Sequence, residues 1–343
     1  MAPSTRKRPR PSSPGPVDAD VTLTNEPSKF NRHPDLWYDD GNVIIATKTQ
    51  ACKVYRGLLS RESPVLNSLF ETDVDEKRRT YEGTPVYEVT DSDDDIAAVL
   101  KYVCGMERNH KDVATLTFEA TLAYFRLGTK YEITRLREEA ISRLEMCYPS
   151  TLDSFDCPRN PRPITHTIGQ DSEVSLLALQ NYATLHQLLP AALYACCTLT
   201  TTKLISGIEF AFDFMEPPPA SKLADFWAKV YNGRARLEES RVDDTLCFLD
   251  GAVSNNCERP ACEKTIQSSF RQDRALSRPN PNALENVGPT IKKNSGAKPC
   301  KSCVTYWISR HVEGRQRVWD KLRDIFDIPE PAAGGDVAPA DVS

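Results

Sequence analysis

The spacing of apolar positions changes along the first 150 residues. Apolar or alternating runs predict short strands at residues 43–46, 52–55 and 85–90, the first two forming a hairpin. Apolar positions three and four residues apart predict helices at residues 64–70, 96–103, 117–127 and 133–147. Strands come first and helices later, so we expect an α+β domain over residues 29–150.

Polar stretches mark the connections within this domain. The charged residues 71–83 are expected to form a loop and residues 128–131 a turn. The acidic run from Asp91 to Asp95 is interpreted as the first turn of a helix, because carboxylates favour the positive end of the helix dipole. A metal-binding acidic cluster is the less favoured interpretation.

The second half of the chain predicts helices after a linker. Residues 151–171 are polar and contain three prolines, which is typical of a linker. The region 172–250 is expected to be helical, with an amphipathic helix over 173–189 and further helices from 190, over 204–215 and over 223–248. Residues 251–328 combine a cysteine-bearing loop, long between 277 and 299, with a last helix over 307–326. The ends, 1–28 and 329–343, are predicted to be disordered.

Composition and charge limit the classes of partner that this chain is expected to bind. The chain has 343 residues and a net charge of -5, which counts against a nucleic-acid partner gripped broadly through its phosphates. No apolar run reaches the roughly 18 residues that span a bilayer, so no membrane partner is expected. The cluster Arg6-Lys7-Arg8-Pro9-Arg10 indicates either a nuclear import signal or a solvated basic tail. We therefore expect a protein of the nucleus or the cytoplasm.

The cysteines carry the clearest candidate chemistry. Eleven cysteines without a secretory signal do not indicate a disulfide framework. Cys257 and Cys262 form one closely spaced pair, and Cys300 and Cys303 another. Two such pairs suit a tetrahedral structural zinc site, although residues 263–299 make a longer gap than in standard zinc ribbons. His311 is a substitute ligand; the alternatives are unrelated surface thiols and a redox pair at Cys300 and Cys303.

No catalytic signature accompanies these cysteines. The sequence contains no phosphate-binding loop, dinucleotide fingerprint, H-E-x-x-H or G-x-S-x-G motif. None of the five histidines lies in a recognisable catalytic setting, and His186 is expected to be a partly buried residue of an amphipathic helix. We therefore expect a protein that is not an enzyme.

Several segments of the chain match the pattern of a known family. They are residues 40–44, 54–59, 63–70, 89–92, 127–131 with Leu136, and 188–197. Together they resemble the BTB/POZ family, specifically the BTB proteins of mushroom-forming fungi, and the resemblance covers most of the chain beyond residue 30. Cys52, Tyr55 and Leu66 depart from the residues that this family usually has, and they stay apolar or aromatic.

The resemblance implies a protein–protein interaction module. BTB domains associate, many as homodimers through the N-terminal segment and the first helix. Some recruit a cullin and act as substrate adaptors of ubiquitin ligases, often through a hydrophobic-x-Glu element that Val74-Asp75-Glu76 matches here. The alternative is a nuclear transcriptional regulator that recruits corepressors.

Overall fold

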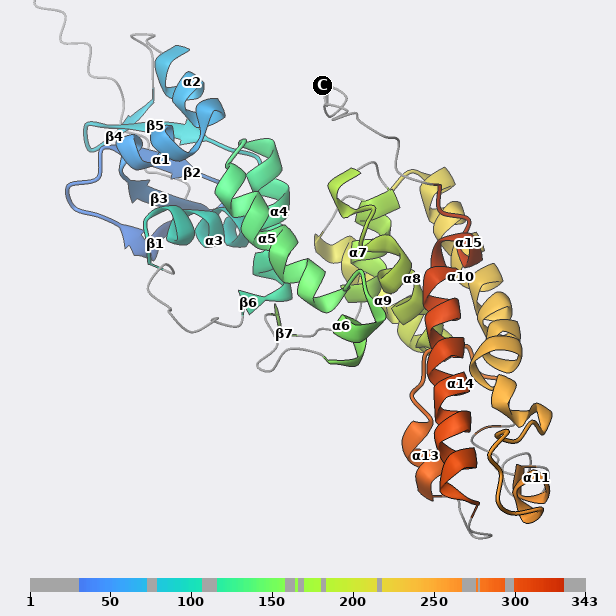
Figure 1. Ribbon diagram of the computed structural model, residues 1–343. Helices are drawn as coiled ribbons and strands as arrows, with labels where there is room; N and C mark the ends of the chain where they lie inside the picture. The colour runs from blue at the N-terminus through green and yellow to red at the C-terminus, as the bar shows by residue number, and fades with distance from the viewer. Residues whose placement is uncertain are drawn as a thin grey trace, which may run out of the picture.

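The computed structural model places an α+β unit at one end of an elongated molecule and helices over the remainder (Figure 1). It describes residues 31–72, 79–106, 116–157, 164–165, 170–179, 183–214, 218–266, 276, 278–293 and 299–329. Some of the predicted features fall outside these residues: the disorder of 1–28 and of the tail after residue 329, the basic cluster at 6–10, and the element Val74-Asp75-Glu76.

The N-terminal unit is built on one small mixed sheet. Its strand order is β1-β3-β2-β5-β4, with β1 parallel to β3, β2 antiparallel to β3 and parallel to β5, and β4 antiparallel to β5. The predicted hairpin is confirmed, since Val43 pairs with Val54 and Ala46 with Ala51. The strands are β1 (Asn31–Trp37), β2 (Val43–Ala46), β3 (Gln50–Val54), β4 (Thr80–Tyr81) and β5 (Thr84–Glu88).

Helices cover one face of this sheet. Alternate residues of the hairpin, such as Ile45 and Cys52, join the main core with the helices, whereas Ile44 and Ala51 form a small cluster on the other face with Val86. The helices are α1 (Arg56–Glu62), α2 (Pro64–Thr72), α3 (Asp93–Val103), α4 (Phe118–Lys130) and α5 (Thr134–Cys147).

Side-chain caps explain where these helices begin. Asn42 accepts the Arg56 N–H at 2.7 Å and so links the turn before β2 to the start of α1. The Ser63 hydroxyl accepts from the Leu66 N–H at 3.0 Å and donates to the Tyr131 carbonyl at 2.6 Å, which joins α2 to the end of α4. Ser92 caps α3, so the acidic run does form the first helical turn, as predicted.

Two connections in this unit differ from prediction. The stretch 71–83 is not only a loop, because Thr80 and Tyr81 form β4 on the edge of the sheet. The predicted turn at 128–131 belongs largely to α4, which continues to Lys130. Gly128 permits this, since a Cβ there would lie 2.8 Å from the Arg137 backbone nitrogen of α5. Glycine thus lets the two helices approach closely.

The remainder is mostly helical. The predicted linker is partly ordered, because it contains α6 and β7, and β7 pairs in parallel with β6. The elements are β6 (Leu116–Thr117), α6 (Leu152–Asp156), β7 (Ile164–Thr165), α7 (Gln170–Leu179), η1 (Ala183–Leu185), α8 (Leu189–Thr198), α9 (Thr201–Phe214), α10 (Ala220–Ser240), η2 (Arg241–Thr245), η3 (Cys247–Asp250), α11 (Ala261–Thr265), α13 (Gly288–Lys293), α14 (Lys301–Asp320) and α15 (Leu322–Ile325).

Helix α7 corrects the prediction of an amphipathic helix over 173–189. It ends at Leu179 and all ten of its residues are buried, because it packs against α8, α9 and α10. His186 lies half-buried in the turn before α8 and not within a helix. The stretch 277–299 is also not a simple long loop, because it contains α13.

The apolar side chains of the helical half divide between two cores. The main core extends from the N-terminal unit through α7, α8 and α10 to α15. A second, smaller core lies at the N-terminal end of α14. It contains Leu246, Phe248, Ile291 and Trp307 with three of the cysteines. Among the described residues, no helix has the length and apolar character that crossing a membrane requires.

Candidate metal centre

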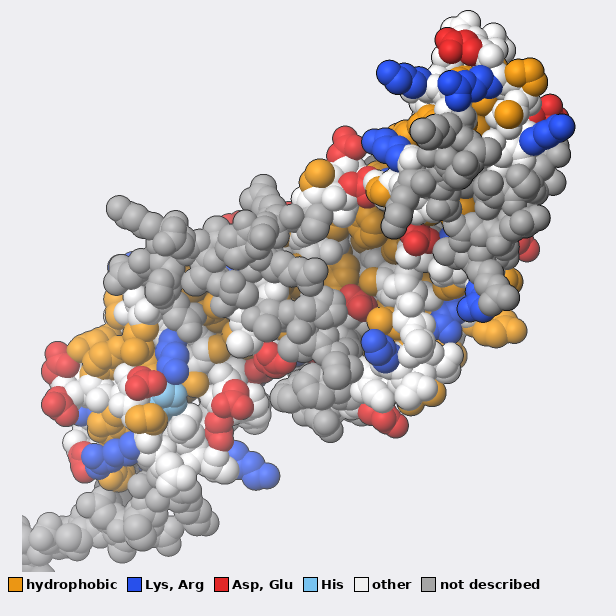
Figure 2. Space-filling view, turned by 90° about the horizontal axis from the view of Figure 1, so that it is seen from below, with side chains coloured by type: hydrophobic (Ala, Val, Ile, Leu, Met, Phe, Trp, Pro, Cys, Tyr) orange, Lys and Arg blue, Asp and Glu red, His pale blue; other side chains and the backbone are white. Residues whose placement is uncertain are grey.

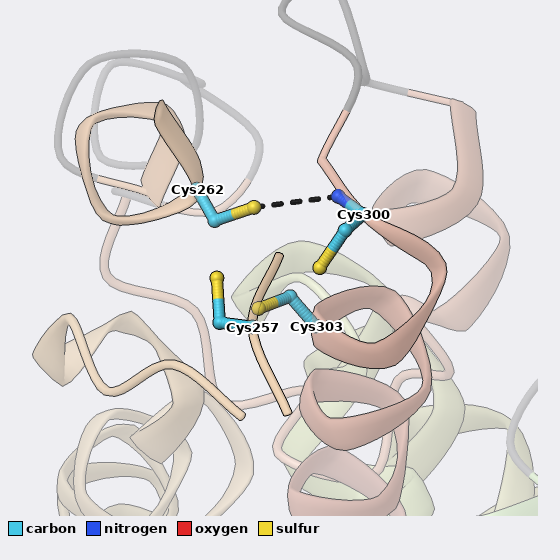
Figure 3. A group of neighbouring side chains, drawn as sticks. All are labelled: Cys257, Cys262, Cys300 and Cys303. Carbon is cyan, nitrogen blue, oxygen red and sulfur yellow. Dashed lines mark hydrogen bonds between the residues drawn. The ribbon is translucent and has the colours of Figure 1, made fainter. Parts of the chain in front are cut away.

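The four predicted cysteines come together at the smaller core. The sulfur atoms of Cys257, Cys262, Cys300 and Cys303 all lie within 4.8 Å of one another. Figure 3 shows their side chains pointing toward a common centre, two from the segment around α11 and two from the start of α14. Four thiolates at about 2.3 Å from a tetrahedral zinc ion would lie about 3.8 Å apart, so these side chains fit that ion.

Local structure turns each pair of cysteines inward. Cys257 follows a turn in which its N–H donates to the Ser254 carbonyl at 2.9 Å, and Cys262 lies in the first turn of α11. Cys300 is the N-cap residue of α14 and Cys303 lies in its first turn. The Cys300 N–H donates to the Cys262 sulfur at 3.3 Å, so the two pairs are also joined directly.

Burial and hydrogen bonding shift the pKa values of three of the four thiols in different directions. Backbone hydrogen bonds, from Glu258 first and then from Cys303, lower the pKa of Cys300 to about 6 and favour its thiolate. Burial raises the pKa of Cys262 and of Cys303, which favours their protonated forms in the absence of a cation. A coordinated divalent cation removes such protons, and the donor set is therefore suited to a thiophilic metal.

The alternative that Cys257 and Cys262 are unrelated surface thiols is contradicted. Such thiols would be exposed and apart, whereas Cys262 is buried, Cys257 is half-buried, and their sulfurs lie within 4.8 Å of those of Cys300 and Cys303. The redox pair at Cys300 and Cys303 stays a hypothesis, and these two cysteines share their site with two more sulfurs. The geometry supports a four-thiolate metal centre.

His311 is not a substitute ligand. It is fully buried two helical turns beyond Cys303, and both ring nitrogens already have protein partners. Nδ1 lies 3.0 Å from the Thr245 carbonyl, and Nε2 accepts the Val287 N–H at 3.1 Å. A neutral ring that donates from Nδ1 fits both contacts, and burial lowers the pKa of His311 accordingly.

Helix α14 carries a column of contacts away from the centre, and all of its members except the partly buried Trp319 are buried. Its members follow at every fourth residue: Cys303, Trp307, His311, Arg315 and Trp319. The indole N–H of Trp307 donates to the Ala252 carbonyl at 2.9 Å, and that of Trp319 to the Ser150 carbonyl at 3.2 Å. The column therefore reaches from the cysteines to the segment that follows α5.

Arginines hold the segment between the cysteine pairs. Arg241, which is 2% exposed, donates to the Leu276 carbonyl at 3.0 Å and pairs with Glu285 at 3.0 Å. Arg315 donates to the Leu284 carbonyl at 2.8 Å. Sequence reasoning assigned no role to these arginines, because their partners are distant in the chain and follow no motif.

Comparison with known proteins supplies no relative. No family model matches this sequence, no curated protein matches it, and no solved structure matches it.

Proposed function

We propose that this chain is a protein–protein interaction protein whose N-terminal unit is a BTB/POZ-type domain that self-associates. The observation that carries the proposal is the order of elements around the sheet. A β2–β3 hairpin leads into the helix pair α1–α2, β5 joins β2 in parallel, and α3, α4 and α5 follow. This order agrees with the α+β domain that the sequence predicts over residues 29–150, and it supports the proposal.

The first helix offers a direct test of self-association. Gly57 of α1 is exposed, and a Cβ built on it meets no atom within 4 Å. A side chain there fits the monomer, whereas a bulky charged one obstructs an interface over α1. We expect sedimentation equilibrium to show a dimer for the full chain and for Gly57→Ala, and a monomer for Gly57→Arg.

Either of two results argues against this proposal. A monomeric mass for the full chain at high concentration would show that the chain does not self-associate. A dimer that forms with unchanged affinity in Gly57→Arg would show that the interface does not include α1.

Recruitment of a cullin is a narrower form of the proposal. It rests on Val74-Asp75-Glu76, which lie outside the described residues, and on the family resemblance. Affinity purification of the wild type and of Glu76→Lys tests it, because a cullin adaptor should lose its cullin in the variant. Corepressors in place of a cullin would favour the nuclear regulator.

We also propose that the four cysteines hold a structural zinc ion. The gathering of four sulfurs within 4.8 Å supports it. Zinc would stabilise the smaller core, since its four bonds would join the segment around α11 to the start of α14. Elemental analysis of the purified chain should give one zinc per chain.

Single cysteine variants distinguish zinc bound at this site from zinc bound adventitiously elsewhere on the protein. Cys303→Ser should lose the zinc, whereas Cys157→Ser, which changes an exposed cysteine outside the group, should retain it. Equal zinc content in both variants would place the metal elsewhere.

A further inference from the structure

Glu173 is a buried carboxylate in a protein whose charges mostly face water. Figure 2 shows Lys, Arg, Asp and Glu side chains on the described surface of one face, where water solvates them. The Glu173 side chain is only 4% exposed, and it lies in the first turn of α7, a helix whose ten residues are all buried. A buried carboxyl ionises readily only where protein groups replace the water that it has lost. The charge of Glu173 therefore depends on its neighbours.

The first turn of α7 contacts the N-terminal unit through two carboxylates. Asp171 accepts the hydroxyl of Tyr148, the C-cap residue of α5, at 2.8 Å. Glu173 accepts from Nη1 of Arg126 on α4 at 3.4 Å. Two polar contacts thus join α7 to the ends of the N-terminal unit, and the second depends on the charge of Glu173.

Arg126 is shared between carboxylates of two helices. Its Nη2 donates to both carboxylate oxygens of Asp95 on α3, at 3.2 Å and 3.0 Å. The 3.4 Å contact with Glu173 is longer than these and longer than the roughly 2.7–2.9 Å of a strong charge-assisted hydrogen bond. The guanidinium therefore compensates Asp95 more fully than Glu173.

The charges around Glu173 do not balance. Arg126 favours its ionised form, whereas Glu119 on α4 and Asp95 on α3 oppose it. Burial is the largest influence and raises the pKa of Glu173 to about 7. Three carboxylates around one guanidinium explain why Arg126 does not restore the ordinary pKa.

The other elements packed against α7 do not supply the missing positive charge. Helix α8 and η1 contain no Asp, Glu, Lys, Arg or His. Cys196 of α8 has its sulfur 3.7 Å from the Ser175 hydroxyl of α7, and burial raises the pKa of this thiol, so it stays protonated at neutral pH. Within the described residues, the charges that shift the pKa of Glu173 come from α3 and α4 and not from α9 or α10.

We propose that the protonation state of Glu173 controls the contact between α7 and the N-terminal unit. In the closed state the neutral carboxyl stays buried against α4. In the open state the first turn of α7 separates from α4 and the carboxylate reaches water. This proposal goes beyond self-association and the zinc site, and it depends on neither.

The closed state loses stability as pH rises. The pKa of Glu173 is about 7 in the closed state, against the ordinary 4.5 in the open state, so the closed state binds the proton more strongly. The stabilisation is complete below pH 4.5 and is lost as pH rises from 4.5 through about 7. In this range the ratio of open to closed molecules should increase by up to about tenfold per pH unit, and at higher pH it should level off.

Hydrogen exchange of the α7 backbone amides measures this ratio, because a helical amide exchanges when its segment opens. The wild type, Glu173→Gln and Glu138→Gln are compared as full chains between pH 5 and 8, with exchange expressed as protection factors. Gln at position 173 keeps the shape of the neutral carboxyl and does not ionise. Glu138→Gln removes an exposed carboxylate of α5 and is the matched control. Circular dichroism checks that the variants keep the wild-type fold.

We expect the α7 protection factors of the wild type and of Glu138→Gln to fall by up to about tenfold per pH unit from pH 5 to about 7 and then to level off. Those of Glu173→Gln should not change with pH. Acid release of a metal affects all three proteins alike, so the difference between Glu173→Gln and the other two isolates Glu173.

Either of two results overturns the proposal. The first is wild-type protection of α7 that does not change between pH 5 and 7. The second is the same fall in Glu173→Gln as in the wild type, which assigns the effect to another group. Should Glu173→Gln misfold, Glu119→Gln replaces it. That variant removes a negative charge beside Glu173, so protection should level off at a lower pH than in the wild type, and an unchanged pH would also overturn the proposal.

Discussion

Arg315 and Asp156 are 159 residues apart in the chain and are joined by two hydrogen bonds. The guanidinium of Arg315 on α14 donates to both carboxylate oxygens of Asp156 on α6, at 2.7 Å and 2.5 Å. The Arg315 side chain is 3% exposed and that of Asp156 is 33% exposed. The pair joins the cysteine-bearing helix to the segment that leaves the N-terminal unit.

Asp156→Asn should destabilise the protein, because it leaves a buried guanidinium without its counter-charge. Fully buried pairs cost about 3–5 kcal/mol when one partner is removed, and the partial exposure of Asp156 reduces our expectation to about 2 kcal/mol. Urea unfolding measures the change. Asp153→Asn, an exposed neighbour on the same helix, should change the free energy of unfolding by less than about 0.5 kcal/mol. Equal destabilisation in the two variants would contradict this role.

Gly314→Ala should be among the most damaging small substitutions. A Cβ on Gly314 would lie 2.0 Å from the Asp244 carbonyl oxygen, so α14 and η2 would have to separate. We expect a decrease of about 3 kcal/mol in the free energy of unfolding. Gly57→Ala on α1, where the space is open, should instead be neutral or stabilising by roughly 0.5–1 kcal/mol. Thermal unfolding of both variants checks the contrast.

Metal removal should be visible in the fluorescence of Trp307. Its indole is fully buried in the smaller core, one helical turn beyond Cys303. Chelation should loosen that core, expose the indole to water and shift the emission of the protein to longer wavelength. Trp307→Phe should abolish the shift, whereas Trp227→Phe, which changes a residue packed on the main core, should retain it. A shift that survives Trp307→Phe would place the metal near another tryptophan.

His311 should make stability depend on pH. Burial, opposed by its hydrogen bond to Thr245, lowers the pKa of His311 below the ordinary value of 6.5; Arg315 lowers it further, while Asp156 and Glu285 raise it. As pH falls, the unfolded chain therefore takes up the proton first. The stabilisation is complete above pH 6.5 and is lost as pH falls from 6.5 through the folded pKa, by at most about 1.4 kcal/mol per pH unit.

Urea unfolding between pH 7.5 and 5.5 measures this slope. His311→Gln lacks the titrating ring and should have a shallower slope over the same range. Acid release of a metal affects both proteins, so the difference between the two slopes isolates His311. Identical slopes would show that the ring does not titrate differently on folding.

The sequence predicted most of the N-terminal unit because its information is local. The hairpin at 43–55 and the acidic first turn of α3 each depend on residues close to one another in the chain. The gathering of the cysteines was also predictable, since a spacing of two to four residues lets two thiolates face one ion.

Long-range pairing explains what the sequence could not predict. Helix α7 begins with Gln170, Asp171, Ser172 and Glu173, which predict a solvated end, and all four are buried. Tyr148 donates to Asp171 at 2.8 Å, and Arg126 pairs with Glu173 at 3.4 Å. Burial raises the pKa of Glu173 to about 7, despite the opposing charge of Arg126. Nothing in the local pattern indicates these partners.

The column on α14 requires a constant spacing between its members along the chain. Each residue turns an α-helix by about 100°, so a step of four residues overshoots a full turn by about 40°. Successive members from Cys303 to Trp319 thus wind around the helix and reach partners on different sides. A single inserted or deleted residue within this stretch would rotate every later member by about 100° away from its partner. Homologous chains should therefore vary in the length of their connections but keep the spacing from Cys303 to Trp319 constant.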